Sequence, residues 1–249
     1  MGVNWQAGIP TEGIECVGFV REFSRWVNTQ DQAKTIPTPV GSLYPNECLN
    51  LNPVSDGVPA VMDFHYQQFQ ELGMGISPVM TMTIPTYSGS TDPDVIVREQ
   101  WRPIQWVSDG QGGWDPGENM EAPGSYIERA DWMYHYIGRY GSGTTVPNIL
   151  TDCELKYCAQ EEDHANLGRL HYVESWNEPN RSWTNPAGDP VHSQFTPQEY
   201  AAMASCDYDG HENTVIAQRL NCINEEVEYA VGVHNIDENI NFVIEKNFN

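Results

Sequence analysis

The chain has 249 residues with 35 acidic against 12 basic side chains, a formal net charge of −23 at pH 7. A field of that sign repels phosphate backbones and anionic lipid, so it excludes nucleic acid and membrane surfaces as partners and tolerates a neutral polymer. Hydrophobic residues make up 39% of the chain and aromatic residues 11%, which indicates a folded protein. We expect one domain over 1–249, because no low-complexity linker or repeat divides it.

The opening segment, MGVNWQAGIP, lacks the basic start and the apolar middle of a signal peptide. No run approaches the roughly 18 apolar residues of a membrane helix. The chain is therefore expected to be cytoplasmic, or to have had an export signal removed. Six cysteines allow many disulfide pairings, and the sequence does not choose among them. We expect no metal and no cofactor, since cysteines and histidines lack metal-ligand spacing.

Apolar periodicity predicts strands and helices that alternate along the chain. The first elements are two strands and a long polar loop, at 2–8, 16–23 and 28–57. A helix is expected over 61–73, with Gly73 where a C-terminal cap belongs. The next segment, 75–85, is rich in β-branched residues and predicts a third strand.

A second long loop is expected over 86–123, followed by a helix over 125–141. Ser125 and Glu128 have the spacing of a capping box at the start of that helix. A fourth strand, LHYVESWN, spans 170–177.

The last predicted elements follow a loop. FTPQEYAAMAS predicts a helix that begins with Thr196 as cap, Pro197 at the first helical position and Glu199 three residues after the cap. A further helical stretch around 223–232 leads to a fifth strand, NINFVIEK, over 239–246.

The alternation of elements predicts an α/β fold with a parallel sheet, either an open sheet or a (β/α)8 barrel. Long loops after the strands favour the barrel, in which such loops build the active face. No glycine-rich phosphate turn follows the first strand, which weakens a nucleotide-binding alternative.

The segment WNEPN places Glu178 after the fourth expected strand, where barrel enzymes carry catalytic groups. Pro179 disfavours helical geometry in the residue before it, so Glu178 is expected to stay extended at the strand mouth. Asn177 supplies an amide that can bind a sugar hydroxyl. Trp176 and Trp183 add flat apolar faces nearby.

These residue types fit glycoside hydrolysis, which needs a carboxylic acid to protonate the leaving oxygen and a second carboxylate as nucleophile or base. An indole wall beside Glu178 would favour the protonated form of the acid. Glu174 does not fit the second role, because four residues along a strand span roughly 13 Å. The pair must lie about 5 to 5.5 Å apart for retention or about 6.5 to 9.5 Å for inversion. We expect Glu174 to satisfy a local hydrogen bond.

The motif WNEPN at the end of a fourth strand resembles the acid/base motif of clan A glycoside hydrolases, the retaining (β/α)8 enzymes that include family 5 and family 39. Arg21, in FVREF, matches the arginine that those enzymes often carry at the end of the second strand. The segments SYIERADWMYHYIGRYG and FTPQEYAAMASCDYDGH also resemble bacterial hydrolases of this clan. The likeness spans nearly the whole chain.

The resemblance implies that Glu178 is the general acid/base, that Asn177 binds the sugar 2-hydroxyl and that Arg21 is a partner to the nucleophile. In the clan the nucleophile is a glutamate at the end of the seventh strand, and this chain reaches only about the fifth. Glu245 follows a strand, but the fifth one. The expected fold is therefore an incomplete (β/α)8 TIM-type barrel of about five βα units. Its open edge would invite a homo-oligomer or a complementing chain.

Aromatic residues in the loops are further candidates for binding sugar. Trp26 and Tyr87, just beyond the second and third strands, are well placed for a cleft. Trp101, Trp106 and Trp114 suit two roles equally, stacking on sugar rings or pinning their long loop to the body of the protein.

Two functions stay open. The first is a retaining glycosidase that cleaves a β-linked polysaccharide or oligosaccharide in an extracellular or periplasmic location. The second is a non-catalytic carbohydrate-binding protein on an incomplete hydrolase barrel, in which Glu178 and Asn177 only hydrogen-bond the sugar. A second carboxylate near Glu178 distinguishes them.

Overall fold

The computed structural model describes residues 2–5, 13–14, 16–25, 61–81, 92–143, 166–181, 183–184, 190–191, 194–220 and 226–244. Of the expected elements, the loop over 28–57 lies outside these residues. No helix among the described residues is long and apolar enough to span a bilayer.

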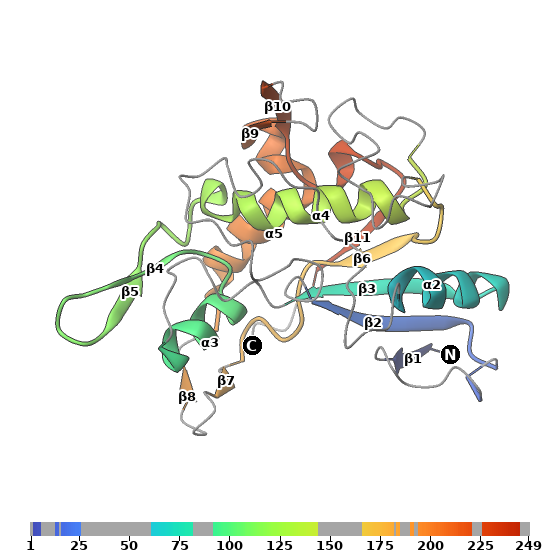
Figure 1. Cartoon of the computed structure of the whole chain (residues 1–249), viewed down its shortest axis with the longest axis horizontal. Coiled ribbons are helices and arrows are strands. Elements are labelled where there is room, and N and C mark those ends of the chain that lie inside the picture. The colour runs from blue at the N-terminus through green and yellow to red at the C-terminus, as the bar shows by residue number, and fades with distance from the viewer. Residues whose placement is uncertain are drawn as a thin grey trace.

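A parallel sheet of five strands is the centre of the fold (Figure 1). Its strands, in spatial order, are β1 (Gly2–Trp5), β2 (Phe19–Arg25), β3 (Gly75–Thr81), β6 (Tyr172–Glu174) and β11 (Asn241–Val243). All four neighbouring pairs are parallel. The α/β class and the five strands expected from the sequence are thereby confirmed.

Helices cover one face of the sheet. The first is α2 (Val61–Glu71), and the second is α4 (Ile127–Tyr140), which runs along the sheet in Figure 1. The core between them joins side chains of both helices to side chains of β2, β3 and β6, among them Phe69, Trp132, Val20, Ile76 and Val173. The burial of these apolar side chains stabilises the helix-covered face.

The two-residue period of β2 explains how one strand serves both faces of the sheet. Val20, Glu22 and Ser24 are buried, whereas Arg21 and Phe23 between them are half-buried. The Glu22 carboxylate accepts a hydrogen bond from the Tyr66 hydroxyl of α2 (3.1 Å). The alternate residues, Arg21 among them, therefore project from the opposite face.

A second core lies beyond the strand ends. It is built by α3 (Pro93–Trp101), the antiparallel pair β4 (Trp106–Ser108) and β5 (Trp114–Pro116), α5 (Pro197–Asn213) and the antiparallel pair β9 (Ile216–Leu220) and β10 (Glu226–Ala230). The hairpin β4–β5 projects from one end of the molecule in Figure 1. Two short helices, η2 (Pro123–Tyr126) and η3 (Val233–Asn235), and the strands β7 (Trp183–Thr184) and β8 (Pro190–Val191) complete the described elements.

Several predicted helix ends are confirmed. Gly73 follows α2 with φ +71°, and the amide of Met74 bonds back to the Phe69 carbonyl (2.9 Å). The capping box of α5 is complete, because Thr196 and Glu199 each accept a hydrogen bond from the other's backbone amide.

Three predictions were wrong. The segment 86–123 contains α3 and the β4–β5 hairpin instead of one loop. Within the expected helical stretch around 223–232, residues Glu226–Ala230 form strand β10, which pairs with β9. The capping box before α4 is absent, because η2 precedes that helix and its N-cap residue, Tyr126, makes no side-chain cap.

Candidate functional site

The segment WNEPN follows the carboxyl end of β6, as expected. Glu174 is the last residue of this strand and pairs with Val79 of β3 and Val243 of β11. The Ser175 amide still bonds to the Val243 carbonyl (3.1 Å). Residues after Ser175 therefore leave the sheet at the edge where parallel sheets carry binding and catalytic groups.

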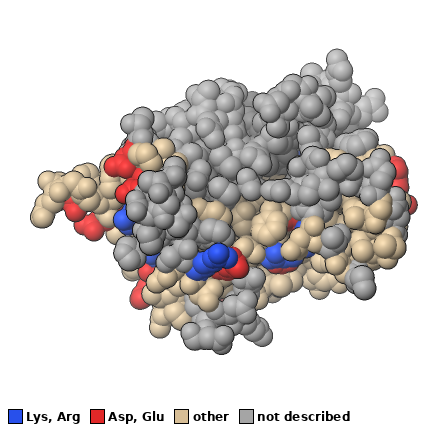
Figure 2. Space-filling view, turned by 90° about the horizontal axis from the view of Figure 1, so that it is seen from below, with Lys and Arg blue, Asp and Glu red and all other residues tan. Residues whose placement is uncertain are grey.

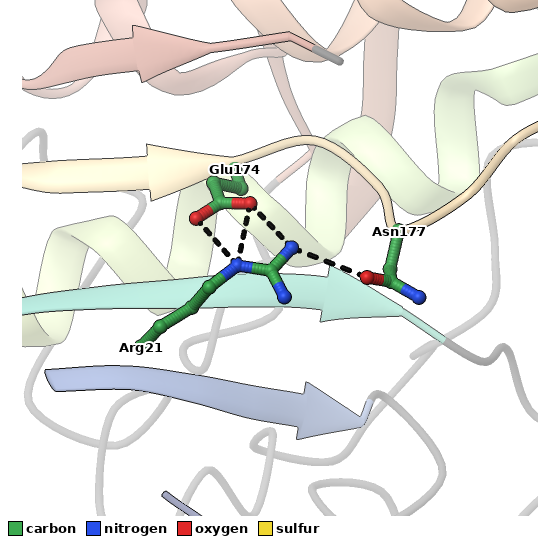
Figure 3. Close-up of polar contacts among 3 residues, drawn as sticks. All are labelled: Arg21, Glu174 and Asn177. Atoms are coloured by element: carbon green, nitrogen blue, oxygen red, sulfur yellow. Dashed lines mark hydrogen bonds and ion pairs between the residues drawn. The ribbon is translucent and has the colours of Figure 1, made fainter. Parts of the chain in front are cut away.

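Arg21, Glu174 and Asn177 form a polar group on the face opposite the helices (Figure 3). Arg21 Nε lies 2.9 Å from both carboxylate oxygens of Glu174, and Arg21 Nη2 lies 2.6 Å from Glu174 Oε2. The same Nη2 donates to Asn177 Oδ1 at 3.2 Å. The side chain of Arg21 is 21% exposed and that of Glu174 is 13% exposed, so the group borders solvent.

The role expected for Glu174 was wrong. Its hydrogen bond is not local, because Arg21 lies 153 positions away in the sequence. The distance that excluded it as a second carboxylate assumed that the strand continues to Glu178. Strand β6 ends at Glu174, and the chain bends after it, so that spacing does not apply.

Glu178 is not extended as expected, but has left-handed backbone geometry with φ +50°. Pro179 disfavours the right-handed helical region for the preceding residue, and the left-handed region remains accessible at a cost. The Glu178 carbonyl accepts from the Arg181 amide (3.0 Å), which closes a turn with Pro179 at its second position. The Glu178 side chain is 41% exposed and contacts Arg181 Nη1 at 2.9 Å.

Trp176 lies in the core instead of beside Glu178. Its side chain is 1% exposed. The ring packs edge-to-face against Phe195 (centroids 5.5 Å apart) and under the guanidinium of Arg129 (4.6 Å). The expected indole wall beside Glu178, and direct sugar contact by Trp176, are therefore not supported by this arrangement.

A buried ion pair supports the same segment from the helix side. Arg129 of α4 and Asp207 of α5 both have fully buried side chains, and Arg129 Nε lies 3.0 Å from Asp207 Oδ2. That oxygen also accepts from the Ser175 hydroxyl (2.6 Å). Burial raises the pKa of Asp207 above its ordinary value, although Arg129 and the Ser175 hydroxyl oppose the rise.

Sequence reasoning missed Arg129 and Asp207. They belong to different helices and lie 78 positions apart, so no local spacing connects them. The signal that could have found Arg129 is its place in α4, a helix whose described side chains are nearly all buried. A charge in such a helix requires a partner.

The remaining site predictions are only partly described. Trp183 belongs to β7, which pairs with β8 after the WNEPN segment, but its side chain lies outside the described residues. Trp26, Tyr87 and Glu245 lie outside them too. No group of three or more His, Cys, Asp or Glu side chains in the described ranges could hold a metal ion. Cys16 and Cys206 are free thiols.

The local charge near the site differs from the strong acidity of the whole chain. Arg21 offsets Glu174 and Arg181 offsets Glu178. On the face shown in Figure 2, blue basic atoms similarly adjoin red acidic atoms. These pairs therefore leave little net charge at the site.

Comparisons with protein-family models, with curated proteins and with solved structures found no match. The resemblance of WNEPN to the acid/base motif of clan A glycoside hydrolases therefore stays a prediction.

Proposed function

We propose that the chain is a retaining glycosidase acting on a β-linked polysaccharide or oligosaccharide, with Glu178 as general acid/base and the parallel sheet as part of a (β/α)8-type barrel. The observation that carries the proposal is the position of Asn177 and Glu178. They come three and four residues after Glu174, which ends the parallel strand β6. Arg21 of β2 donates a hydrogen bond to Asn177.

Asn177 is suited to bind a sugar hydroxyl. Its Oδ1 accepts from Arg21, which fixes the orientation of the amide, and its Nδ2 points away from the guanidinium (Figure 3). An oriented amide donates to a hydroxyl at a lower cost in entropy than a freely rotating one. Arg21 acts through Asn177 in this proposal and does not itself need to contact the sugar.

Glu174 is the first residue to test as the second carboxylate. It shares the guanidinium of Arg21 with Asn177, and Glu178 directly follows Asn177. A nucleophile or an electrostatic stabiliser in such a site is a carboxylate held in place, and Arg21 holds both oxygens of Glu174. This assignment also gives Arg21 the role that the resemblance implies, a partner to the nucleophile.

A non-catalytic carbohydrate-binding protein is the second candidate. It is favoured by the ion pairing of both carboxylates, since Glu178 contacts Arg181 and both oxygens of Glu174 contact Arg21. In that function Asn177 and Glu178 bind hydroxyl groups and no bond is cleaved.

Hydrolysis of aryl β-glycosides tests the two functions. We expect Glu178→Gln to lower kcat/KM by about 10²-fold or more on a substrate with a poor phenol leaving group, and much less on one with a dinitrophenol leaving group. The smaller effect is expected because an activated phenolate leaves without a proton. Arg181→Gln is the matched control, since it removes the partner of Glu178 and keeps the carboxyl group.

Equal, background-level release by the wild type and Glu178→Gln contradicts the glycosidase proposal. Binding of oligosaccharides measured by calorimetry then decides the second candidate. Loss of that binding in Asn177→Ala supports it, and unchanged binding contradicts it.

A further inference from the structure

The end of β6 is joined to β3 in an unusual way. The two strands share one register pair, Val79 with Glu174. The residues after this pair are Met80 on β3 and Ser175 just beyond β6. Both turn their carbonyls to the guanidinium of Arg129. Arg129 Nη2 donates to the Met80 carbonyl at 3.0 Å and also to the Ser175 carbonyl. The arginine thus takes the place of the next step of the strand ladder.

This contact accounts for the short length of β6. The sequence predicts a strand through Asn177, but the Ser175 carbonyl bonds to the Arg129 guanidinium instead of to a neighbouring strand. The next residue, Trp176, stacks its ring on the same guanidinium and is thereby held in the core. Ser175 and Trp176 are buried, and Asn177 and Glu178, which follow them, are half-buried.

We propose that Arg129, balanced by Asp207, is the positioning residue of the candidate site: by holding Ser175 and Trp176 it sets the orientation of Asn177 and Glu178. The consequence for catalysis rests on the proposed function, whereas the consequence for the order of this segment does not. Arg129 contacts the Ser175 carbonyl and the Trp176 ring, and it acts on Asn177 and Glu178 through these two residues.

Arginine is required here by geometry. Its planar fork bonds a carboxylate through Nε and two carbonyls through Nη2 while one face stacks on an indole. A lysine supplies the charge but not the flat stacking surface or the fixed directions of the donors. Asp207 neutralises the guanidinium and bonds the Ser175 hydroxyl, so the pair holds Ser175 through both its backbone and its side chain.

The chain offers a matched control in a second buried ion pair. Arg102 Nη2 lies 2.5 Å from Glu199 Oε2, and these side chains are 8% and 9% exposed. The pair joins the end of α3 to the first turn of α5, and Arg102 also stacks on Phe195. It resembles the Arg129 pair in burial and stacking, but among the described residues it bonds neither Met80 nor Ser175 and reaches the WNEPN segment only through Phe195, which packs on Trp176.

Amide hydrogen exchange of the full chain, followed by peptide, tests the inference. We expect Arg129→Met to speed exchange in peptides covering 175–181 by about tenfold or more under native conditions, with Arg129→Lys intermediate. Arg102→Met, compared at equal residual stability, should speed exchange in these peptides much less, because Arg102 reaches the segment only through Phe195. Arg129→Met combined with Asp207→Asn leaves no stranded charge, and so provides a folded variant if the single variant is too unstable.

Kinetics supply the second readout. On an aryl β-glycoside we expect Arg129→Met to lower kcat by up to about 10²-fold with KM within about threefold, as misplacement of a reacting group does. Equal exchange at 175–181 in the Arg129 and Arg102 variants overturns the inference. If the wild type does not hydrolyse the glycoside, the proposed function fails, and the exchange comparison still decides the positioning role.

Discussion

Arg21 and Arg129 hold the same strand end from opposite faces of the sheet, and they do so in different surroundings. Arg21 is 21% exposed and donates hydrogen bonds to the side chains of Glu174 and Asn177. Arg129 is fully buried and bonds two backbone carbonyls as well as a carboxylate. One arginine borders solvent, and the other belongs to the core.

The partners of the two guanidinium groups, backbone for Arg129 and side chains for Arg21, indicate two different roles for arginine. A guanidinium bonded to backbone fixes where the chain goes, because its partners cannot rotate away. A guanidinium bonded to side chains at a solvent border fixes how those side chains are presented, and a ligand can compete for them. A sugar hydroxyl can therefore alter the contacts of Arg21, whereas it cannot reach Arg129 without disruption of the core.

Replacing each arginine by methionine should give the largest contrast. We expect Arg129→Met to lower the free energy of unfolding by about 3–5 kcal/mol, because it leaves the Asp207 charge buried without its partner. We expect Arg21→Met to cost about 1 kcal/mol or less, since its pair is partly exposed and screened by solvent. Urea denaturation measures both values.

The double variant Arg129→Met with Asp207→Asn is the control for the stranded charge. It should recover a large part of the loss, because neither remaining side chain carries a charge. A similar cost for Arg21→Met and Arg129→Met would contradict the contrast between a solvent-border pair and a core pair.

The pH dependence of stability should separate the buried pair further. Burial raises the pKa of Asp207, so the native state binds a proton at a pH where the unfolded chain is still ionised. The stabilisation that Asp207 contributes is therefore fully present below the ordinary aspartate pKa of about 4. It is lost as pH rises through the raised pKa of the native state. One proton sets an upper limit of about 1.4 kcal/mol per pH unit.

The measurement is the difference in unfolding free energy between the wild type and Asp207→Asn as a function of pH. This difference should fall as pH rises through that window. Ser175→Ala keeps the Asp207 carboxyl group and removes a hydrogen bond that opposes the rise of its pKa. In the Ser175→Ala background, the fall of this difference should therefore extend to higher pH. A difference that is flat or increases with pH would contradict this assignment.

Local patterns predicted the parts of the fold that depend on neighbouring residues. The cap of α5 needs only Thr196 and Glu199, three positions apart, and the end of α2 needs only Gly73. The placement of WNEPN after a parallel strand also followed from periodicity. Signals for α3 and β10 were present too, in Asp92 as an N-cap before a proline and in the alternation of EVEYA, but the tryptophan-rich segment and the acidic residues obscured them.

The contacts that shape the candidate site could not be predicted in this way. Arg21 meets Glu174 across 153 positions and Arg129 meets Asp207 across 78, so each pair exists only after the sheet and both helices have assembled. The short length of β6 has the same origin, because its ladder ends where a helix supplies a guanidinium. Nonlocal partners, not local propensity, decide where this strand ends.

The smallest effect is expected at Glu178, whose backbone has left-handed geometry just after the residues that Arg21 and Arg129 hold. A non-glycine residue at φ +50° costs about 1 kcal/mol, and glycine adopts this geometry freely but loses more entropy on folding. We expect Glu178→Gly to stabilise the chain by about 0.5 kcal/mol relative to Glu178→Gln, which keeps the β-carbon. Both variants lose the exposed ion pair with Arg181, whose loss should matter little. The expected 0.5 kcal/mol already includes the entropy that glycine loses, so urea midpoints that favour glutamine over glycine would contradict a strained backbone at this position. The strain would then have no part in how Glu178 is presented at the end of the sheet.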